Sequence, residues 1–182
     1  ETLSGIKKLK AYTSGGKVNR LRVDMGKAIL EPKEIPVVLD GDKVVDRPVE
    51  IAGKNYNITC VSMGNPHCVV FMDDIDNLDI ETVGPEFEND KLFPERVNTE
   101  FVTVLDDHTI KMRVWERGSG ETWACGTGAC AVAVAACENG FCKKGEDIKI
   151  KLKGGDLIIN YTDETVYMTG NAEKVFEGEV EV

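Results

Sequence analysis

The sequence is poor in histidine, has no closely spaced pair of cysteines and contains no long apolar run. His67 and His108 are the two histidines in 182 residues, and no Cys-x-x-Cys motif occurs. Structural zinc sites are built from such cysteine and histidine clusters, so we expect no bound metal. A membrane-spanning helix needs about 20 predominantly apolar residues, so we also expect no membrane partner.

Basic residues are in the minority. The chain has 22 Lys and Arg against 32 Asp and Glu, which gives a net charge of −10 and a pI of about 4.8. Nucleic acids and anionic membrane surfaces attract basic proteins. The charge therefore predicts that the main partner is neither a nucleic acid nor a membrane surface.

The cysteines do not form a recognisable disulfide framework. Their spacing in a chain of this size favours reduced thiols and a cytoplasmic protein. The chain begins without methionine, so we expect that its first residue is not the natural start. The six cysteines are Cys60, Cys68, Cys125, Cys130, Cys137 and Cys142.

Short strands dominate the pattern along the chain. Alternating polarity on both sides of Gly15-Gly16 predicts a hairpin over residues 6–12 and 17–24, and we place a domain crossing near Gly26. A short acidic surface helix with solvated charges is expected over 78–90. The class is α+β, with many short strands around one helix. Further strands are expected at 37–39, 49–51, 55–63, 68–71, 99–105, 110–115, 147–152, 157–161 and 166–168, and, after a break at 170–171, at one or two places within 172–182.

The stretch from Trp115 to Glu138 is the most informative part of the sequence. It reads as the end of a strand, a glycine-rich turn with Cys125, the small residues 126–128, and then a helix. A helix start has unpaired N–H groups and partial positive charge, and it binds anions. A cysteine at such a place can have its pKa lowered from ~8.5 to ~3.5–7.5, so an activated thiol is expected. The alternative is an inert buried cysteine, because free cysteine usually behaves as a small hydrophobe.

The expected helix has an unusual composition. From Ala129 to Cys137 its side chains are small and none is charged. A helix that is apolar on all sides is buried. We therefore predict a central helix wrapped by a sheet, with Asn139-Gly140 as its C-cap.

A second turn also carries candidate site residues. Gly64-Asn65-Pro66 has the chemistry of a turn, and a buried strand, 68–71, is expected to follow. This turn presents Asn65 and His67 at the mouth of the strand. Histidine is suited to adjust a nearby thiol around neutral pH, whereas the alternative is an ordinary turn with a solvated histidine.

Together, the Gly-Asn-Pro-His turn and the segment Glu-Arg-Gly-Ser-Gly-Glu-Thr-x-Ala-Cys-Gly-Thr-Gly-Ala resemble the diaminopimelate epimerase family. The segments 93–101 and 167–170 are also similar to the family. The resemblance implies a barrel-like, mostly antiparallel sheet around a central small-residue helix. It implies an isomerase that converts L,L- to meso-diaminopimelate, for lysine and peptidoglycan synthesis, with two cysteines as acid and base. It also implies that no pyridoxal phosphate, metal or other cofactor is used.

The same resemblance assigns roles to residues. Cys125 would be one of the two acid/base cysteines, and the backbone N–H groups of Gly126 and Thr127 would bind the α-carboxylate of the substrate. The remaining roles fall on polar side chains that precede the helix. Substrate would be held by Asn65, Asn98 and Arg117, while Glu116 would face its amino group and, with His67, adjust the thiol pKa values.

One family motif is absent. The other catalytic cysteine of the family lies in an Asn-x-Asp-Gly-Ser…Cys-Gly-Asn-Gly stretch, which this sequence lacks. We therefore interpret residues 27–170 as a carboxy-terminal epimerase domain. Residues 1–26 would be remnant strands of an amino-terminal domain, and 171–182 would return to it. We expect the chain alone to be inactive and to form a homodimer.

Two other functions stay open. Proline and hydroxyproline racemases share the fold and the paired cysteines. A non-catalytic anion-binding module is favoured by the missing second cysteine.

Overall fold

The computed structural model describes residues 5–181, which form one large sheet, two α-helices and a 3₁₀ turn. The helices are α1 (Ile80–Glu88) and α2 (Gly126–Glu138), and the 3₁₀ turn is Pro32–Glu34. The strands are β1 (Leu9–Ser14), β2 (Lys17–Gly26), β3 (Arg47–Ile51), β4 (Lys54–Ser62), β5 (Pro66–Phe71), β6 (Asn98–Asp106), β7 (Thr109–Glu116), β8 (Gly120–Thr122), β9 (Asp147–Leu152), β10 (Gly155–Tyr161) and β11 (Val166–Asn171).

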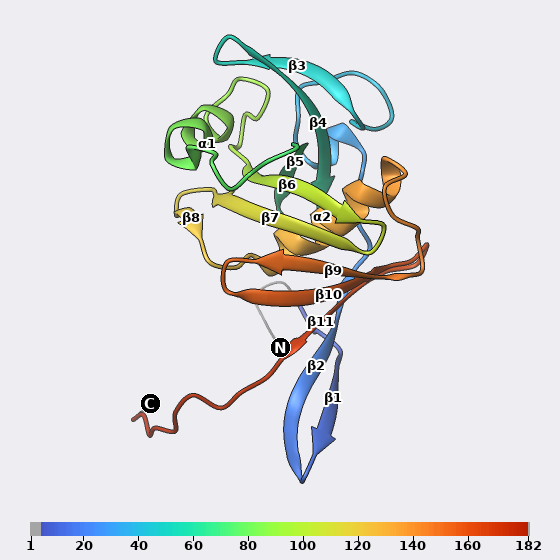
Figure 1. The fold of residues 1–182 in the computed structure, drawn as a ribbon, viewed down its shortest axis with the longest axis vertical. Helices are drawn as coiled ribbons and strands as arrows, with labels where there is room; N and C mark the ends of the chain where they lie inside the picture. Colours follow the sequence, from blue (N-terminus) through green and yellow to red (C-terminus); the bar gives the residue numbers. More distant parts are fainter. Residues whose placement is uncertain (1–4, 182) are drawn as a thin grey trace.

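The sheet curls around α2 without closing into a barrel. Its strand order is β1-β2-β11-β10-β9-β7-β6-β5-β4-β3, and β8 pairs with β7. Neighbouring strands are antiparallel except for the pairs β5/β6 and β7/β9. Helix α2 packs against β4, β5, β6, β9, β10 and β11, so strands enclose it from several sides (Figure 1). The expected α+β class and the sheet around a central helix are confirmed.

Strand alternation divides the interior into two cores. Successive side chains of a strand point to opposite faces of the sheet. Val102 and Val114 therefore pack with α2 in one core, whereas Phe101 and Val70 pack with the buried side of α1 in the other. The central strands are buried on both faces, and the two helices lie on opposite sides of β6 and β7.

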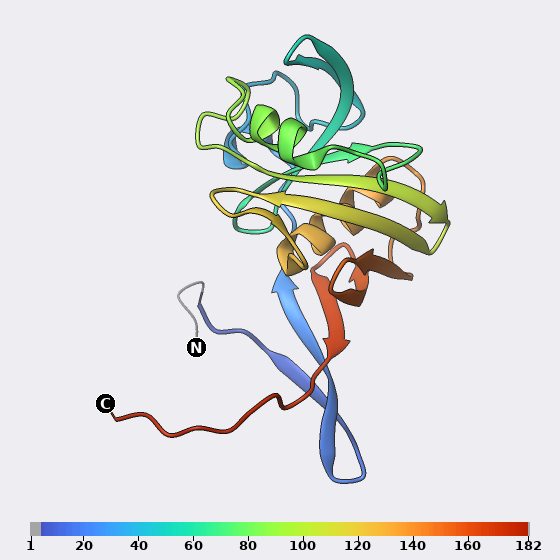
Figure 2. The ribbon, with the colours of Figure 1, turned by 60° about the vertical axis from the view of Figure 1, so that its left-hand side comes forward.

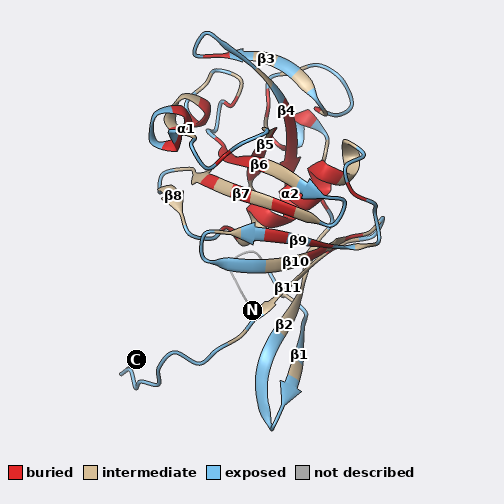
Figure 3. Cartoon of the chain, viewed as in Figure 1, coloured by how far each residue is buried: buried red, intermediate tan, exposed pale blue. Residues whose placement is uncertain are grey.

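Helix α2 is buried along almost its whole length (Figure 3). It begins at Gly126 with Cys125 as the N-cap, so residues 126–128 form its first turn rather than a loop before it. This differs from the expected start because the Cys125 sulfur accepts a hydrogen bond from the Gly128 N–H and so caps the helix. Asn139 is the C-cap and Gly140 has a φ of 78°, which confirms the expected helix end.

Helix α1 is the expected short helix, but one of its charges is buried. Asp79 caps its N-terminus by accepting a hydrogen bond from the Thr82 N–H. Ile80 and Phe87 face the second core. The prediction of solvated charges is wrong for Glu88, which is buried because it accepts hydrogen bonds from the Trp115 indole and the Gly118 N–H.

The amino-terminal hairpin extends beyond the body of the fold. Strands β1 and β2 pair with each other as expected, and β2 continues by pairing with β11. Figures 1 and 2 show the hairpin projecting from the body, and its outer part is exposed. The division of the chain at Gly26 and near residue 170 stays a prediction.

Two expected strands are not formed. Residues 37–39 lie in a loop, where the Val37 and Val38 N–H groups bond to Pro32 and Leu92 carbonyls instead of a strand. Residues 172–181 also form no strand, and Val182 lies outside the described residues. The expected break at 170–171 is wrong as well, since β2 offers a pairing edge that carries β11 through to Asn171.

Within residues 5–181, no helix combines the length and the apolar character needed to cross a membrane.

We predict that Gly84→Ala destabilises the fold. A Cβ at this position would lie 2.3 Å from a ring carbon of Trp115. Alanine normally stabilises a helix interior by about 0.5–1 kcal/mol relative to glycine, but overpacking of a core costs about 1–3 kcal/mol. Urea unfolding should show a net loss of about 1–2 kcal/mol. Glu81→Ala, at an exposed position of the same helix, is the control, and an unchanged or raised stability of Gly84→Ala would contradict the packing argument.

Candidate active site

Polar side chains gather on the face of the sheet that carries α2. His67 on β5 is in register with Asn98 on β6, and Glu100 lies two residues further along β6. Glu116 ends β7 two residues after Val114, which packs in the core around α2. Because side chains alternate along strands, these four groups share one face, and the start of α2 lies beside them.

Cys125 is held in place by the helix that it caps. Its sulfur lies 3.3 Å from the Gly128 backbone nitrogen, which donates to it, and 3.5 Å from the Thr127 Oγ1. The residue is only 6% exposed. A Cβ on Gly128 would lie 3.1 Å from this sulfur and 2.6 Å from the Glu100 Oε1. Glycine is therefore needed at 128 to let the helix approach β6.

The environment of Cys125 raises its pKa instead of lowering it. Burial is the main cause and the negative charge of Glu100 the second, and together they raise the pKa of Cys125 to about 12. The hydrogen bonds from Thr127 and Gly128 lower the pKa and only partly offset this. The expected lowering at a helix N-terminus is therefore wrong for this chain, because desolvation of the thiolate outweighs the hydrogen bonds from the helix start.

His67 is not the solvated histidine of an ordinary turn. It is 0% exposed, its Nδ1 lies 2.7 Å from the Glu100 Oε1, and its Nε2 lies 3.0 Å from the Asn65 Oδ1. The Asn65 Nδ2 in turn donates to the Thr127 Oγ1 at 3.3 Å. This contact joins the Gly-Asn-Pro-His turn to the start of α2. The two motifs that the sequence singled out therefore meet in space.

Asn98 and Arg117 form a second connection at the same edge. The Asn98 Nδ2 donates to the Pro66 carbonyl at 2.8 Å, and its Oδ1 accepts from the Arg117 N–H at 2.9 Å. The Arg117 guanidinium donates to the Glu95 carbonyl. The Glu116 carboxylate accepts from the Thr122 hydroxyl at 2.5 Å. The arginine is thus positioned through both its backbone and its side chain.

Sequence reasoning missed two carboxylates. Glu100 contacts His67 inside the site, and its place two residues after Asn98 on a strand was the available signal. Glu88 accepts hydrogen bonds from Arg96, Gly118 and Trp115, and so braces the turn after Arg117. No local pattern marks Glu88, because its partners lie in other elements.

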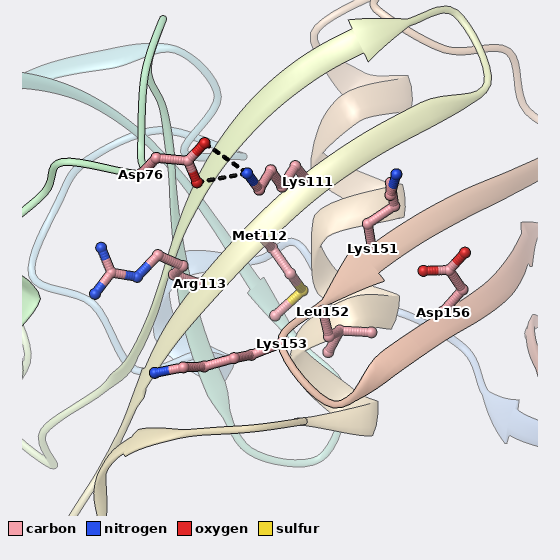
Figure 4. Close-up of a pocket in the computed structure, with 8 residues that line it drawn as sticks. All are labelled: Asp76, Lys111, Met112, Arg113, Lys151, Leu152, Lys153 and Asp156. Atoms are coloured by element: carbon pink, nitrogen blue, oxygen red, sulfur yellow. Dashed lines mark hydrogen bonds and ion pairs between the residues drawn. The ribbon is translucent and has the colours of Figure 1, made fainter.

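A surface pocket beside β7 and β9 is separate from this cluster. None of the candidate site residues lines it, and its lining includes the Asp76–Lys111 ion pair (Figure 4). The candidate site is therefore defined by its converging side chains and by the helix start. The pocket is lined by Asp76, Lys111, Met112, Arg113, Lys151, Leu152, Lys153 and Asp156.

The fold is that of the amino-acid racemases and epimerases. A solved structure titled as a probable proline racemase from Agrobacterium radiobacter K84 superimposes with a TM-score of 0.69 over 92% of this chain and 55% of the other. The sequences are 14% identical, so this likeness shows the fold alone. The sheet curled around a small-residue helix is the fold that this chain shares with that structure.

Sequence comparison identifies the family within that class. The family model for diaminopimelate epimerase matches residues 59–175. Diaminopimelate epimerases from Acetivibrio thermocellus and Agathobacter rectalis are 53% and 50% identical over all of this chain. The chain belongs to the diaminopimelate epimerase family. It spans 65% and 66% of the length of these two relatives.

We predict that the Thr127 hydroxyl controls the reactivity of Cys125. Thr127→Val removes a hydrogen bond that lowers the thiol pKa, so less thiolate is present at a given pH. A net hydrogen bond of about 0.5–1.5 kcal/mol corresponds to alkylation slowed by a factor of about 2 to 13. Iodoacetamide labelling at pH 8, followed by peptide mass spectrometry at Cys125, measures this rate. Thr127→Ser keeps the hydroxyl and should react like the unmodified chain, whereas an unchanged rate in Thr127→Val would refute the assignment.

The raised pKa values of the buried thiols also predict that the fold loses stability at alkaline pH. Burial is the main cause that raises the pKa of Cys125, Cys130 and Cys137 to about 12 and that of Cys142 to about 11. Cysteine in the unfolded chain titrates near ~8.5. Above that pH the folded state holds more protons, so the free energy of unfolding falls, by at most about 1.4 kcal/mol per pH unit per thiol.

Urea unfolding of the reduced chain between pH 7.5 and 10.5 measures how steeply the free energy of unfolding falls with pH. Cys137→Ala removes one of these thiols and should make the decline shallower. A free energy of unfolding that stays constant over this range would show that the thiols ionise alike in both states.

Proposed function

We propose that this chain carries one of the two acid/base faces of a cofactor-independent epimerase that interconverts L,L- and meso-diaminopimelate. The observation that carries the proposal is Cys125 at the N-cap of α2, with its sulfur among the donors of the helix start. Family membership supports the reaction, since the relatives are diaminopimelate epimerases.

The chemistry fits the residues. The α-proton of an amino acid is very weakly acidic, so the base must work in a dry site beside fixed dipoles that stabilise the developing negative charge. The N–H groups of Gly126 and Thr127 belong to the first turn of α2, where intrahelical acceptors are lacking, and they would hold the α-carboxylate. The Cys125 thiolate would take the α-proton as the C–H bond breaks. A second thiol would give its proton to the opposite face of the α-carbon.

The raised pKa of Cys125 makes its thiolate scarce at neutral pH, and the thiolate that does form is strongly basic. Glu116 would face the substrate's amino group, and Arg117 would clamp the distal carboxylate through paired N–H donors. Asn65 and Asn98 would position the substrate, and His67 would adjust the thiol through Asn65.

The second thiol is proposed to come from outside this sequence. The family motif for the other cysteine is absent from the 182 residues, and the chain spans about two thirds of its curated relatives. We therefore propose that the chain alone does not epimerise. Residues 1–26 and 171–182 would then contact an amino-terminal domain, with 27–170 as the carboxy-terminal domain. Homodimer formation and a cytoplasmic location are proposed on the same family basis, and the six free cysteines favour the location.

A non-catalytic anion-binding module is the second candidate. The raised pKa of Cys125 favours it, because at neutral pH the thiol holds its proton. This reading predicts that an anion protects Cys125 from alkylation without any exchange of the substrate's α-proton.

One experiment separates the two functions. The reduced chain is incubated with L,L- or meso-diaminopimelate in heavy water, and the α-proton signals are followed by NMR. We expect slow loss of the α-proton signal without interconversion of isomers, and no exchange in Cys125→Ala. Cys130→Ala, in the same helix, is the matched control and should exchange like the unmodified chain. Interconversion by this chain would contradict the need for a second thiol, and absence of exchange would favour the binding module.

A further inference from the structure

Glu100 and His67 form a buried pair beside the start of α2. Both side chains are 0% exposed, and the Glu100 Oε1 lies 2.7 Å from the His67 Nδ1. The other carboxylate oxygen, Oε2, is buried without a hydrogen-bond partner among the described residues. A carboxyl group placed so deeply, with half of it unsatisfied, is costly unless its charge is balanced.

The neighbour on the other side of the ring limits where protons can be. The His67 Nε2 faces the Asn65 Oδ1, while the Asn65 Nδ2 is directed at Thr127. An amide oxygen only accepts hydrogen bonds, so in this arrangement Nε2 carries a proton. One further proton then belongs to the contact between Nδ1 and Oε1. The pair is either an imidazolium with a carboxylate or a neutral imidazole with a carboxylic acid, and both states have zero net charge.

Burial favours these two protonation states, in which the pair has no net charge. Removing the shared proton would leave a net negative charge in a site without solvent, and an uncompensated buried charge costs several kcal/mol. Burial also raises the pKa of the Glu100 carboxyl above its usual value, although His67 acts in the opposite direction. Among the described residues, the groups whose charges act with that of Glu100 are, besides His67, Cys68 on β5, Glu116 on β7 and Cys125 at the start of α2. Cys60 on β4 pairs with Cys68.

From these contacts we propose that Glu100 is a positioning residue that, with His67, forms one net-neutral buried pair and keeps the His67 Nε2–H directed at Asn65. The inference deepens the proposed function, since it rests on Cys125 as the reacting thiol. In this role Glu100 acts through His67 and Asn65.

The direction of the hydrogen bonds gives the pair its effect. Nε2–H donates to the Asn65 Oδ1, and the Asn65 Nδ2–H donates to the Thr127 Oγ1 at 3.3 Å. The Thr127 hydroxyl, already an acceptor, is left to donate its own proton to the Cys125 sulfur at 3.5 Å. If Nε2 lost its proton, Asn65 would have to turn over, Thr127 would donate to Asn65, and the sulfur would lose this donor.

Pairing with His67 also changes how Glu100 acts on the thiol. Taken as an isolated anion, Glu100 raises the pKa of Cys125. In a net-neutral pair, the charge on His67 or the proton on Glu100 offsets most of that effect. Replacing Glu100 by glutamine would then leave the charge near the sulfur almost unchanged.

The first test is the protonation of His67 in the unmodified, reduced chain. Nitrogen-15 NMR of histidine-labelled protein separates the two ring nitrogens, and the exposed His108 is an internal reference. We expect His67 Nε2 to carry a proton at pH 7. Glu100→Gln should keep this tautomer, because its amide can donate to Nδ1, whereas Glu100→Leu should populate both tautomers. An unprotonated Nε2 at pH 7 in the unmodified chain would overturn the proposal, as would a single unchanged tautomer in Glu100→Leu.

The second test is the alkylation rate of Cys125 at pH 8. We expect Glu100→Gln to react within about threefold of the unmodified chain, whereas an isolated anion would show a rate about tenfold higher for each unit by which the thiol pKa falls. Glu138→Gln, a half-buried carboxylate at the far end of α2, is the matched control. Acceleration of tenfold or more in Glu100→Gln alone would overturn the proposal.

Neither measurement needs turnover. If the α-proton of diaminopimelate does not exchange but His67 keeps its Nε2–H, the proposed function fails while the pair stands. If exchange occurs and Nε2 is unprotonated, the proposed function stands while the proposal for the pair fails.

Discussion

Close contact between a helix of small side chains and the sheet around it is the constraint on which this structure depends. Residues 129–136 of α2 are fully buried, and six strands pack against the helix. Larger side chains would push the strands away, and a charged one would be stranded without water. The helix axis is therefore set by packing. Its N-terminus, with Cys125 as the cap, comes to rest against β5 and β6.

This contact explains both the dry environment of the Cys125 sulfur and the raised pKa of the thiol. The approach of the helix start to β6 requires glycine at 128, and it buries the sulfur next to Glu100 and His67. Burial supplies the dry environment that abstraction of a carbon-bound proton needs, and it also holds the pKa of Cys125 high. The helix-terminal N–H groups are available for a carboxylate, but in this chain they do not outweigh desolvation of the thiolate.

Two turns far apart in the sequence become one site through side-chain contacts. Asn65 joins the turn before β5 to Thr127 on α2, and Asn98 joins the same turn to Arg117. Glu88 braces the far side of the Arg117 turn from α1, which lies against the other face of the sheet. Residues from both sides of the sheet therefore position the same edge of the sheet.

The sequence by itself determined the features that depend on neighbouring residues. Period-two alternation predicted most strands and the amino-terminal hairpin, and the run of small residues predicted α2, its burial and its end at Asn139-Gly140. The motifs around Asn65 and Cys125 pointed to the family. Only the tertiary structure decided the continuation of β11, the loop at 37–39, the burial of Glu88 and Glu100, and the direction of the Cys125 pKa shift. Each of these depends on which distant groups pack together, because pairing edges, desolvation and charge compensation are properties of the assembled fold and not of a local pattern.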